Sequence, residues 1–129
     1  MPHTILLVDD SVVQSFALKV RLERAGYRVL AAPNGARALE IIADEPVDLV
    51  ISDVLMPSMD GYELCRRIKA DPASAKIPII VVSALGETTD PNWRETSGAD
   101  RYLPKPLDHE QLGSVIQTLL APKESTQDR

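Results

Sequence analysis

The chain has 129 residues, of which 44% are apolar and 26% charged, a composition typical of one globular domain with its own hydrophobic core. No apolar stretch approaches the roughly 20 residues that a membrane span needs, and residues 1–4 carry neither the basic region nor the cleavage site of a signal peptide. The formal net charge of −5 argues against nonspecific binding to nucleic acid or anionic lipid. We therefore expect a cytoplasmic protein without membrane insertion and without a direct nucleic-acid partner.

The beginning of the chain predicts a strand, a helix and a second strand. Thr4–Val8 is a short unbroken apolar run, the pattern of a strand that is buried on both faces. Val12–Ala25 is the first predicted helix, with Ser11 as its N-cap and Gly26 as its stop signal. Arg28–Ala31 follows as the second strand.

The middle of the chain continues this alternation. Asn34–Asp44 is a predicted helix with its apolar residues on one face, Leu49–Asp53 is the third strand, and Tyr62–Ala70 is the third helix. Ile79–Ser83 is the fourth strand. Cys65 is the only cysteine, so no internal disulfide can form, and its place within the third helix indicates a small packing residue.

The last third of the chain contains a segment whose structure the pattern does not determine. Gly86–Ser97 permits either a short helix that carries Trp93 or a loop. Arg101–Leu103 is a short fifth strand, and Asp108 caps a final helix with apolar residues at helical spacing. Strands that alternate with helices predict a doubly wound α/β fold, in which helices cover both faces of a five-stranded parallel sheet.

Acidic residues follow two of the apolar runs. Asp9 and Asp10 come directly after the first strand, and Asp53 ends the third. The carboxyl ends of parallel strands line the ligand crevice of an open sheet, so we expect the three carboxylates to converge. Such a cluster repels itself unless a cation lies within it, and carboxylate oxygens suit Mg²⁺. Helix capping before Val12 would explain one of the first two acids but explains two adjacent ones poorly.

Three side chains at this crevice point to phosphoryl chemistry. A carboxylate oxygen of Asp53 is suited to attack a phosphorus centre and form an acyl phosphate. Lys105 stands between two prolines directly after the fifth strand, where its ammonium would neutralise charge on the phosphoryl oxygens. Ser83 ends the fourth strand, and its hydroxyl either donates to a phosphoryl oxygen or caps the next turn.

These residues together resemble the receiver domain of bacterial two-component response regulators. The resemblance covers residues 4–120 and leaves 121–129 as a polar tail or the start of a linker. It implies a flavodoxin-like fold with strand order 2-1-3-4-5. The motifs that carry it, in this order and at these spacings, are Asp9-Asp10, Asp53-Val54-Leu55-Met56-Pro57-Ser58-Met59-Asp60-Gly61, Ser83-Ala84 and Lys105-Pro106.

The resemblance implies that Asp53 is the phosphorylated residue. Asp9, Asp10 and Asp53 would hold Mg²⁺ together with the backbone carbonyl of Leu55. Many members of the family have a polar residue at the position of Leu55 or of Leu85, where it can guide a hydrolytic water. Leucine at both positions would instead shield the acyl phosphate, which predicts a long-lived phosphorylated state.

The resemblance also implies roles near the fourth and fifth strands. Ser83 and Lys105 would contact the phosphoryl group, and the bond between Lys105 and Pro106 is expected to be cis, at a modest cost for a bond before proline. Tyr102 matches an aromatic residue that turns inward when Ser83 moves toward the phosphoryl oxygens. Ordinary packing at the end of a strand is the other interpretation of Tyr102.

The function implied is that of a phosphoryl-accepting signalling domain rather than an enzyme. Its donor would be a histidine kinase or a histidine phosphotransfer domain, and its output partner is unknown. A stand-alone regulator and an N-terminal receiver of a longer hybrid kinase, cyclase or other effector both stay open. An aspartate-nucleophile phosphatase would need a second acid where Leu55 stands. A flavodoxin-like FMN carrier would bind its phosphate where Asp9 and Asp10 repel one.

Overall fold

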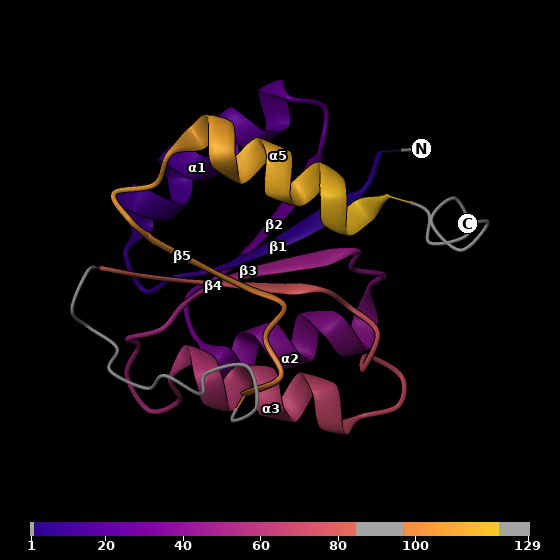
Figure 1. Cartoon of the computed structure of the whole chain (residues 1–129). Coiled ribbons are helices and arrows are strands. Elements are labelled where there is room, and N and C mark those ends of the chain that lie inside the picture. Colours follow the sequence, from indigo (N-terminus) through magenta and orange to yellow (C-terminus); the bar gives the residue numbers. More distant parts are fainter. Residues whose placement is uncertain (1, 85–96, 122–129) are drawn as a thin grey trace.

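The computed structural model describes residues 2–84 and 97–121, which form a parallel sheet between two layers of helices (Figure 1). Within these residues the sheet has five strands in the order β2-β1-β3-β4-β5, so the predicted fold class and strand order are confirmed. The strands are β1 (Thr4–Val8), β2 (Arg28–Ala32), β3 (Leu49–Asp53), β4 (Ile79–Ala84) and β5 (Arg101–Lys105). The helices are α1 (Val12–Arg24), α2 (Gly35–Asp44), α3 (Gly61–Ala70) and α5 (His109–Leu120).

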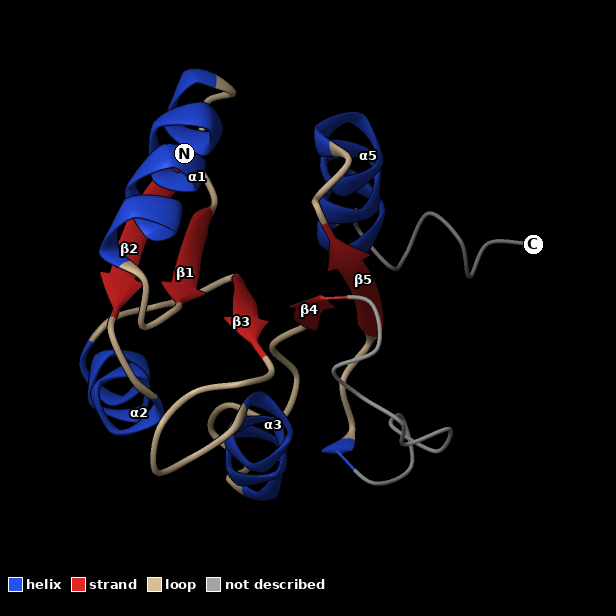
Figure 2. Ribbon diagram, turned by 90° about the vertical axis from the view of Figure 1, so that its left-hand side faces the viewer, coloured by secondary structure: helices blue, strands red, loops and turns tan. Residues whose placement is uncertain are grey.

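The two faces of the sheet bury separate cores. Helices α1 and α5 cover one face, and α2 and α3 cover the other (Figures 1 and 2). Successive residues of a strand point to opposite faces, so Leu6 packs on the α2 and α3 side while Leu7 packs on the α1 and α5 side. Burial on both faces explains why the central strands β1 and β3 have unbroken apolar runs instead of alternating ones.

The register of the strands brings their carboxyl ends to one edge of the sheet. Val8, the last residue of β1, pairs with Ala32 of β2 and with Ser52 of β3. Asp53, the last residue of β3, pairs with Val82 of β4. The loops that follow β1 and β3 therefore begin beside each other, as the crevice argument requires.

Side-chain caps determine where the helices begin. Ser11 accepts a hydrogen bond from the backbone N–H of Gln14, and Asp108 caps α5 in the same way, as predicted. Asn34 was predicted as the first residue of its helix, but it is the N-cap of α2, because its side chain accepts from a backbone N–H while its own backbone is extended. Helix α1 ends one residue earlier than predicted, and Gly26 follows with φ 103°.

Strand β5 is longer than predicted. The predicted strand ends at Leu103, whereas the observed strand continues through Pro104 to Lys105. β5 lies at the edge of the sheet, where a proline does not interrupt a ladder on both sides. Ser83 pairs with Pro104, and Lys105 is thus held by the strand rather than by a free turn.

Several predictions from the sequence concern residues that the structure does not describe. Leu85, Trp93 and nearly all of the segment Gly86–Ser97 lie outside the described residues, and so does the tail from residue 122 onward. Within the described part of the chain, no helix is long and apolar enough to cross a membrane.

Candidate functional site

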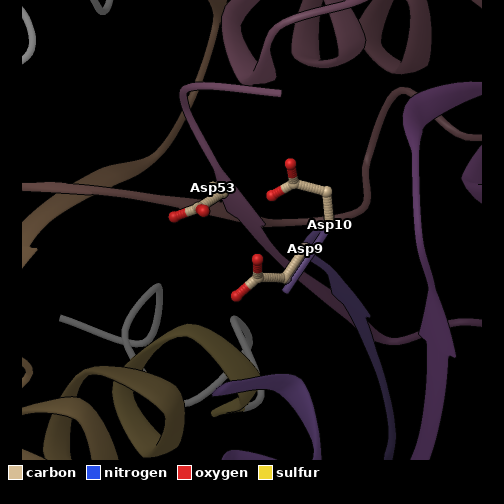
Figure 3. Close-up of side chains that lie close together, drawn as sticks. All are labelled: Asp9, Asp10 and Asp53. Atoms are coloured by element: carbon tan, nitrogen blue, oxygen red, sulfur yellow. The ribbon is translucent and has the colours of Figure 1, made fainter. Parts of the chain in front are cut away.

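Three carboxylates meet at the carboxyl edge of the sheet. Asp9 and Asp10 directly follow β1, and Asp53 ends the neighbouring strand β3. One oxygen atom of each carboxylate lies within 4.8 Å of the others, and Figure 3 shows the three side chains gathered together. This spacing and this set of hard oxygen donors fit a divalent cation such as Mg²⁺, which accepts a few carboxylates and completes its shell with water.

The backbone around Asp9 fixes one side of the acidic cluster. Its N–H donates to the carbonyl oxygen of Ala32 at 3.1 Å, which anchors the end of β1 to β2. Its Oδ1 accepts a hydrogen bond from the N–H of Ser11 at 2.8 Å. Asp10 is exposed to solvent, so it reaches the cluster from the outside.

Asp53 is largely enclosed and contacts a lysine. Its side chain is 12% exposed, and its Oδ1 lies 2.7 Å from Nζ of Lys105. Burial raises the pKa of Asp53 above its ordinary value, the charge of Asp9 raises it further, and the hydrogen bond from Lys105 lowers it. The net shift is upward, so Lys105 only partly offsets the effects of burial and of repulsion by Asp9 on the pKa of Asp53.

Lys105 links two elements to Asp53. Its ammonium also donates a hydrogen bond to Oε1 of Gln14 in the first turn of α1, at 3.1 Å. The peptide bond between Lys105 and Pro106 is cis, as the resemblance implied. The contact with Gln14 was not anticipated from the sequence, because the two residues are 91 positions apart and meet only once the start of α1 and the end of β5 lie at the same edge of the folded sheet.

Two further side chains singled out from the sequence lie on β4 and β5, and a third lies in the loop after β3. Ser83 is fully buried near the end of β4. Tyr102 is half-buried and packs against the core cluster on the α2 and α3 side of the sheet. Leu55, in the loop after β3, is 54% exposed, so it lies at the surface of the site.

A glycine that was not assigned a role supports the loop after β3. A Cβ on Gly61 would clash with the backbone carbonyl oxygen of Asp53. The N–H of Gly61 donates to the carbonyl oxygen of Val54 at 2.7 Å, which closes the loop between β3 and α3. A glycine directly after the N-cap Asp60 was the available signal, since only a missing side chain permits such a close approach.

An apolar surface adjoins the site. Among the described residues, the large hydrophobic side chains classed as exposed are Val12, Val13 and Phe16 of α1 together with Leu55. A cleft of about 620 Å³ between α1 and α5 is lined by residues that include Gln14, Asp53 and Lys105. The cleft therefore gives Asp9 and Asp53 access to solvent.

Comparison with known proteins identifies the family. Residues 5–117 match the model of the response regulator receiver domain. The chain belongs to this family, and it is a phosphoryl-accepting signalling domain of a two-component system. The family is one of regulatory acceptor domains.

The curated relatives differ in length. Protein PilH of Pseudomonas aeruginosa is 37% identical over 117 residues, which cover 91% of this chain and 97% of PilH. The DNA-binding dual master transcriptional regulator RpaA of Synechocystis is 36% identical, and the match covers 93% of this chain but 49% of RpaA. The chain thus spans nearly all of PilH and about half the length of RpaA.

Solved structures of the family have the same fold. A putative response regulator from Chloroflexus aurantiacus is 36% identical with a TM-score of 0.88, and the match covers 95% of this chain and 100% of that one. The response regulator TrrA of Thermotoga maritima, in complex with Mg²⁺-BeF, is 30% identical with a TM-score of 0.81, covering 92% of this chain and 99% of that one. Receiver domains of this family therefore bind magnesium.

Proposed function

We propose that Asp53 accepts the phosphoryl group, from a phosphohistidine of a histidine kinase or a histidine phosphotransfer domain. A carboxylate oxygen of Asp53 attacks the phosphorus, an O–P bond forms and the P–N bond of the donor breaks. The electron pair of that bond stays on the imidazole nitrogen of the donor. The observation that carries the proposal is the position of Asp53, with its Oδ1 2.7 Å from Nζ of Lys105 and two further carboxylates within 4.8 Å.

Asp9, Asp10 and Asp53 would hold Mg²⁺, with the backbone carbonyl of Leu55 as a further ligand. When bound, the ion supplies positive charge to the phosphoryl oxygens. The donor set supports this assignment, because three carboxylates within 4.8 Å repel one another until a cation enters. The complex of TrrA with Mg²⁺-BeF supports it from within the family.

Lys105 and Ser83 would bind the phosphoryl oxygens. Tyr102 would turn inward when Ser83 moves toward these oxygens. The ammonium of Lys105 is already directed at Asp53, so little reorganisation precedes the reaction. Because Ser83 is buried and Tyr102 packs against the core, a movement of either side chain would require its neighbours to shift. A phosphoryl group changes the affinity for an output partner only if the partner binds the phosphorylated and the unphosphorylated conformation with different affinities.

The phosphodonor protein would dock on the exposed apolar side chains beside the acids. These belong to Val12, Val13, Phe16 and Leu55, and contacts made there would bring a donor histidine to Asp53. Whether this receiver acts alone or within a longer protein determines its output. The chain matches nearly all of PilH but about half of RpaA, so similar domains occur both in short proteins and in longer ones.

The test is phosphorylation by a small phosphodonor such as acetyl phosphate, followed by intact-protein mass spectrometry. We expect one phosphoryl group per chain that depends on Mg²⁺ and is released by hydroxylamine, as an acyl phosphate is. Asp53→Asn should remain unlabelled, while the matched variant Asp44→Asn, at the exposed end of α2, should be labelled as the wild type is. Label on Asp53→Asn, or label that resists hydroxylamine, would contradict the assignment.

A further inference from the structure

We propose that Gln14 is a positioning residue that orients the ammonium of Lys105 toward Asp53. The inference rests on the proposed function, because it assumes that Lys105 acts on the phosphoryl group of Asp53. Nζ of Lys105 donates a hydrogen bond to Oε1 of Gln14 at 3.1 Å and lies 2.7 Å from Oδ1 of Asp53. The contact joins residues 91 positions apart, so it ties the first turn of α1 to the end of β5.

The start of α1 leaves the side chain of Gln14 available for this contact. Ser11 and Gln14 have the spacing of a capping box, in which the glutamine side chain accepts a hydrogen bond from the N–H of the cap residue. Here that N–H donates to Oδ1 of Asp9 at 2.8 Å instead. The hydroxyl of Ser11 still caps the helix by accepting from the N–H of Gln14 at 3.3 Å. The helix therefore does not require Oε1 of Gln14, and Lys105 uses it.

A neutral acceptor suits this position for a physical reason. The long side chain of lysine has many rotamers, and ordering it before the reaction costs entropy. An amide oxygen restrains the ammonium without cancelling its charge, whereas a carboxylate would neutralise it and add a fourth acid to the cluster. An ammonium has three donors. Among the described residues two are directed at Asp53 and Gln14, so one is left for a phosphoryl oxygen.

The first test is Gln14→Met, which keeps the length of the side chain and removes the acceptor. The maximal rate of Asp53 phosphorylation by acetyl phosphate should fall about three- to tenfold, a modest loss because the contact is exposed and water competes for it. The Mg²⁺ concentration for half-maximal rate should stay unchanged, since the acids remain in place. Gln111→Met is the matched control, because Gln111 holds the same third helical position after the N-cap of α5. It should react at the wild-type rate.

The decisive test repeats the substitution in a Lys105→Met background. If Gln14 acts through Lys105, Gln14→Met causes no further loss there, whereas a general disturbance of α1 would lower both rates by the same factor. The affinity for beryllium fluoride with Mg²⁺, measured in the same four proteins, gives an equilibrium readout if Lys105→Met reacts too slowly. An unchanged rate for Gln14→Met, or equal losses in both backgrounds, overturns the inference. Absence of label on the wild type would instead contradict the proposed function itself.

Discussion

The crowding of acids at the carboxyl edge of the sheet has a measurable consequence for stability. One carboxylate oxygen of Asp9 lies within 4.8 Å of one of Asp53. Two unit charges at that distance repel by about 1 kcal/mol in water and by about 3.5 kcal/mol at an effective dielectric of about 20. Lys105 offsets part of this repulsion, but the pKa of Asp53 is still raised, so the unfavourable interactions are the larger ones. We expect Asp53→Asn to stabilise the metal-free protein by about 1 kcal/mol at neutral pH.

The pH dependence follows from the direction of the shift. The pKa of Asp53 is higher in the folded protein than the ordinary pKa of an aspartate. An acid with a raised folded pKa destabilises the fold at every pH above that pKa, and this penalty is lost as the pH falls through it. The advantage of Asp53→Asn should therefore be largest near neutrality and should disappear as the pH falls toward the ordinary pKa of an aspartate.

The assay is thermal or urea unfolding in EDTA, at pH values between neutrality and the ordinary pKa of an aspartate. The measurement is then repeated with Mg²⁺. A stabilisation of about 1 kcal/mol corresponds to a rise of roughly 3–5 °C in Tm for a domain of this size. Mg²⁺ should stabilise the wild type, by about 2.7 kcal/mol at a hundredfold excess over its Kd, and should stabilise Asp53→Asn much less. The control Asp44→Asn should keep the full response to Mg²⁺. A less stable Asp53→Asn at neutral pH, or a difference that does not depend on pH, would refute the reasoning.

Three further outcomes are expected. Leu55→Asn, in a chain that keeps Leu85, should speed hydrolysis of the acyl phosphate up to about tenfold, because an amide can hold the attacking water; equal decay rates would contradict the shielding argument. Gly61→Ala should destabilise the fold by about 1–3 kcal/mol in urea unfolding, because the new methyl meets the backbone of Asp53. Burial raises the pKa of Cys65 to about 12, so thiol reagents should modify it only after unfolding; rapid labelling of the native protein would disprove its place in the core.

The main elements of the fold were predictable because each depends on a local pattern. A strand buried on both faces requires a run such as Thr4–Val8, and a helix start requires a cap such as Ser11. The end of β5 was not predictable in the same way. Pro104 lacks the backbone N–H that a strand inside a sheet needs. β5 continues to Lys105 because it lies at the edge of the sheet.

The candidate site also combines features that local sequence patterns predict with features that depend on tertiary packing. Local sequence patterns predict that Asp9, Asp10 and Asp53 stand at the ends of buried parallel strands, and such ends share one edge of the sheet. Three features follow only from the tertiary structure: the distances between the carboxylates, the burial of Asp53 and the contact between Gln14 and Lys105. Hydrogen bonds and charge interactions depend on distances between atoms, and for residues far apart in the chain those distances exist only once the helices have packed against the sheet.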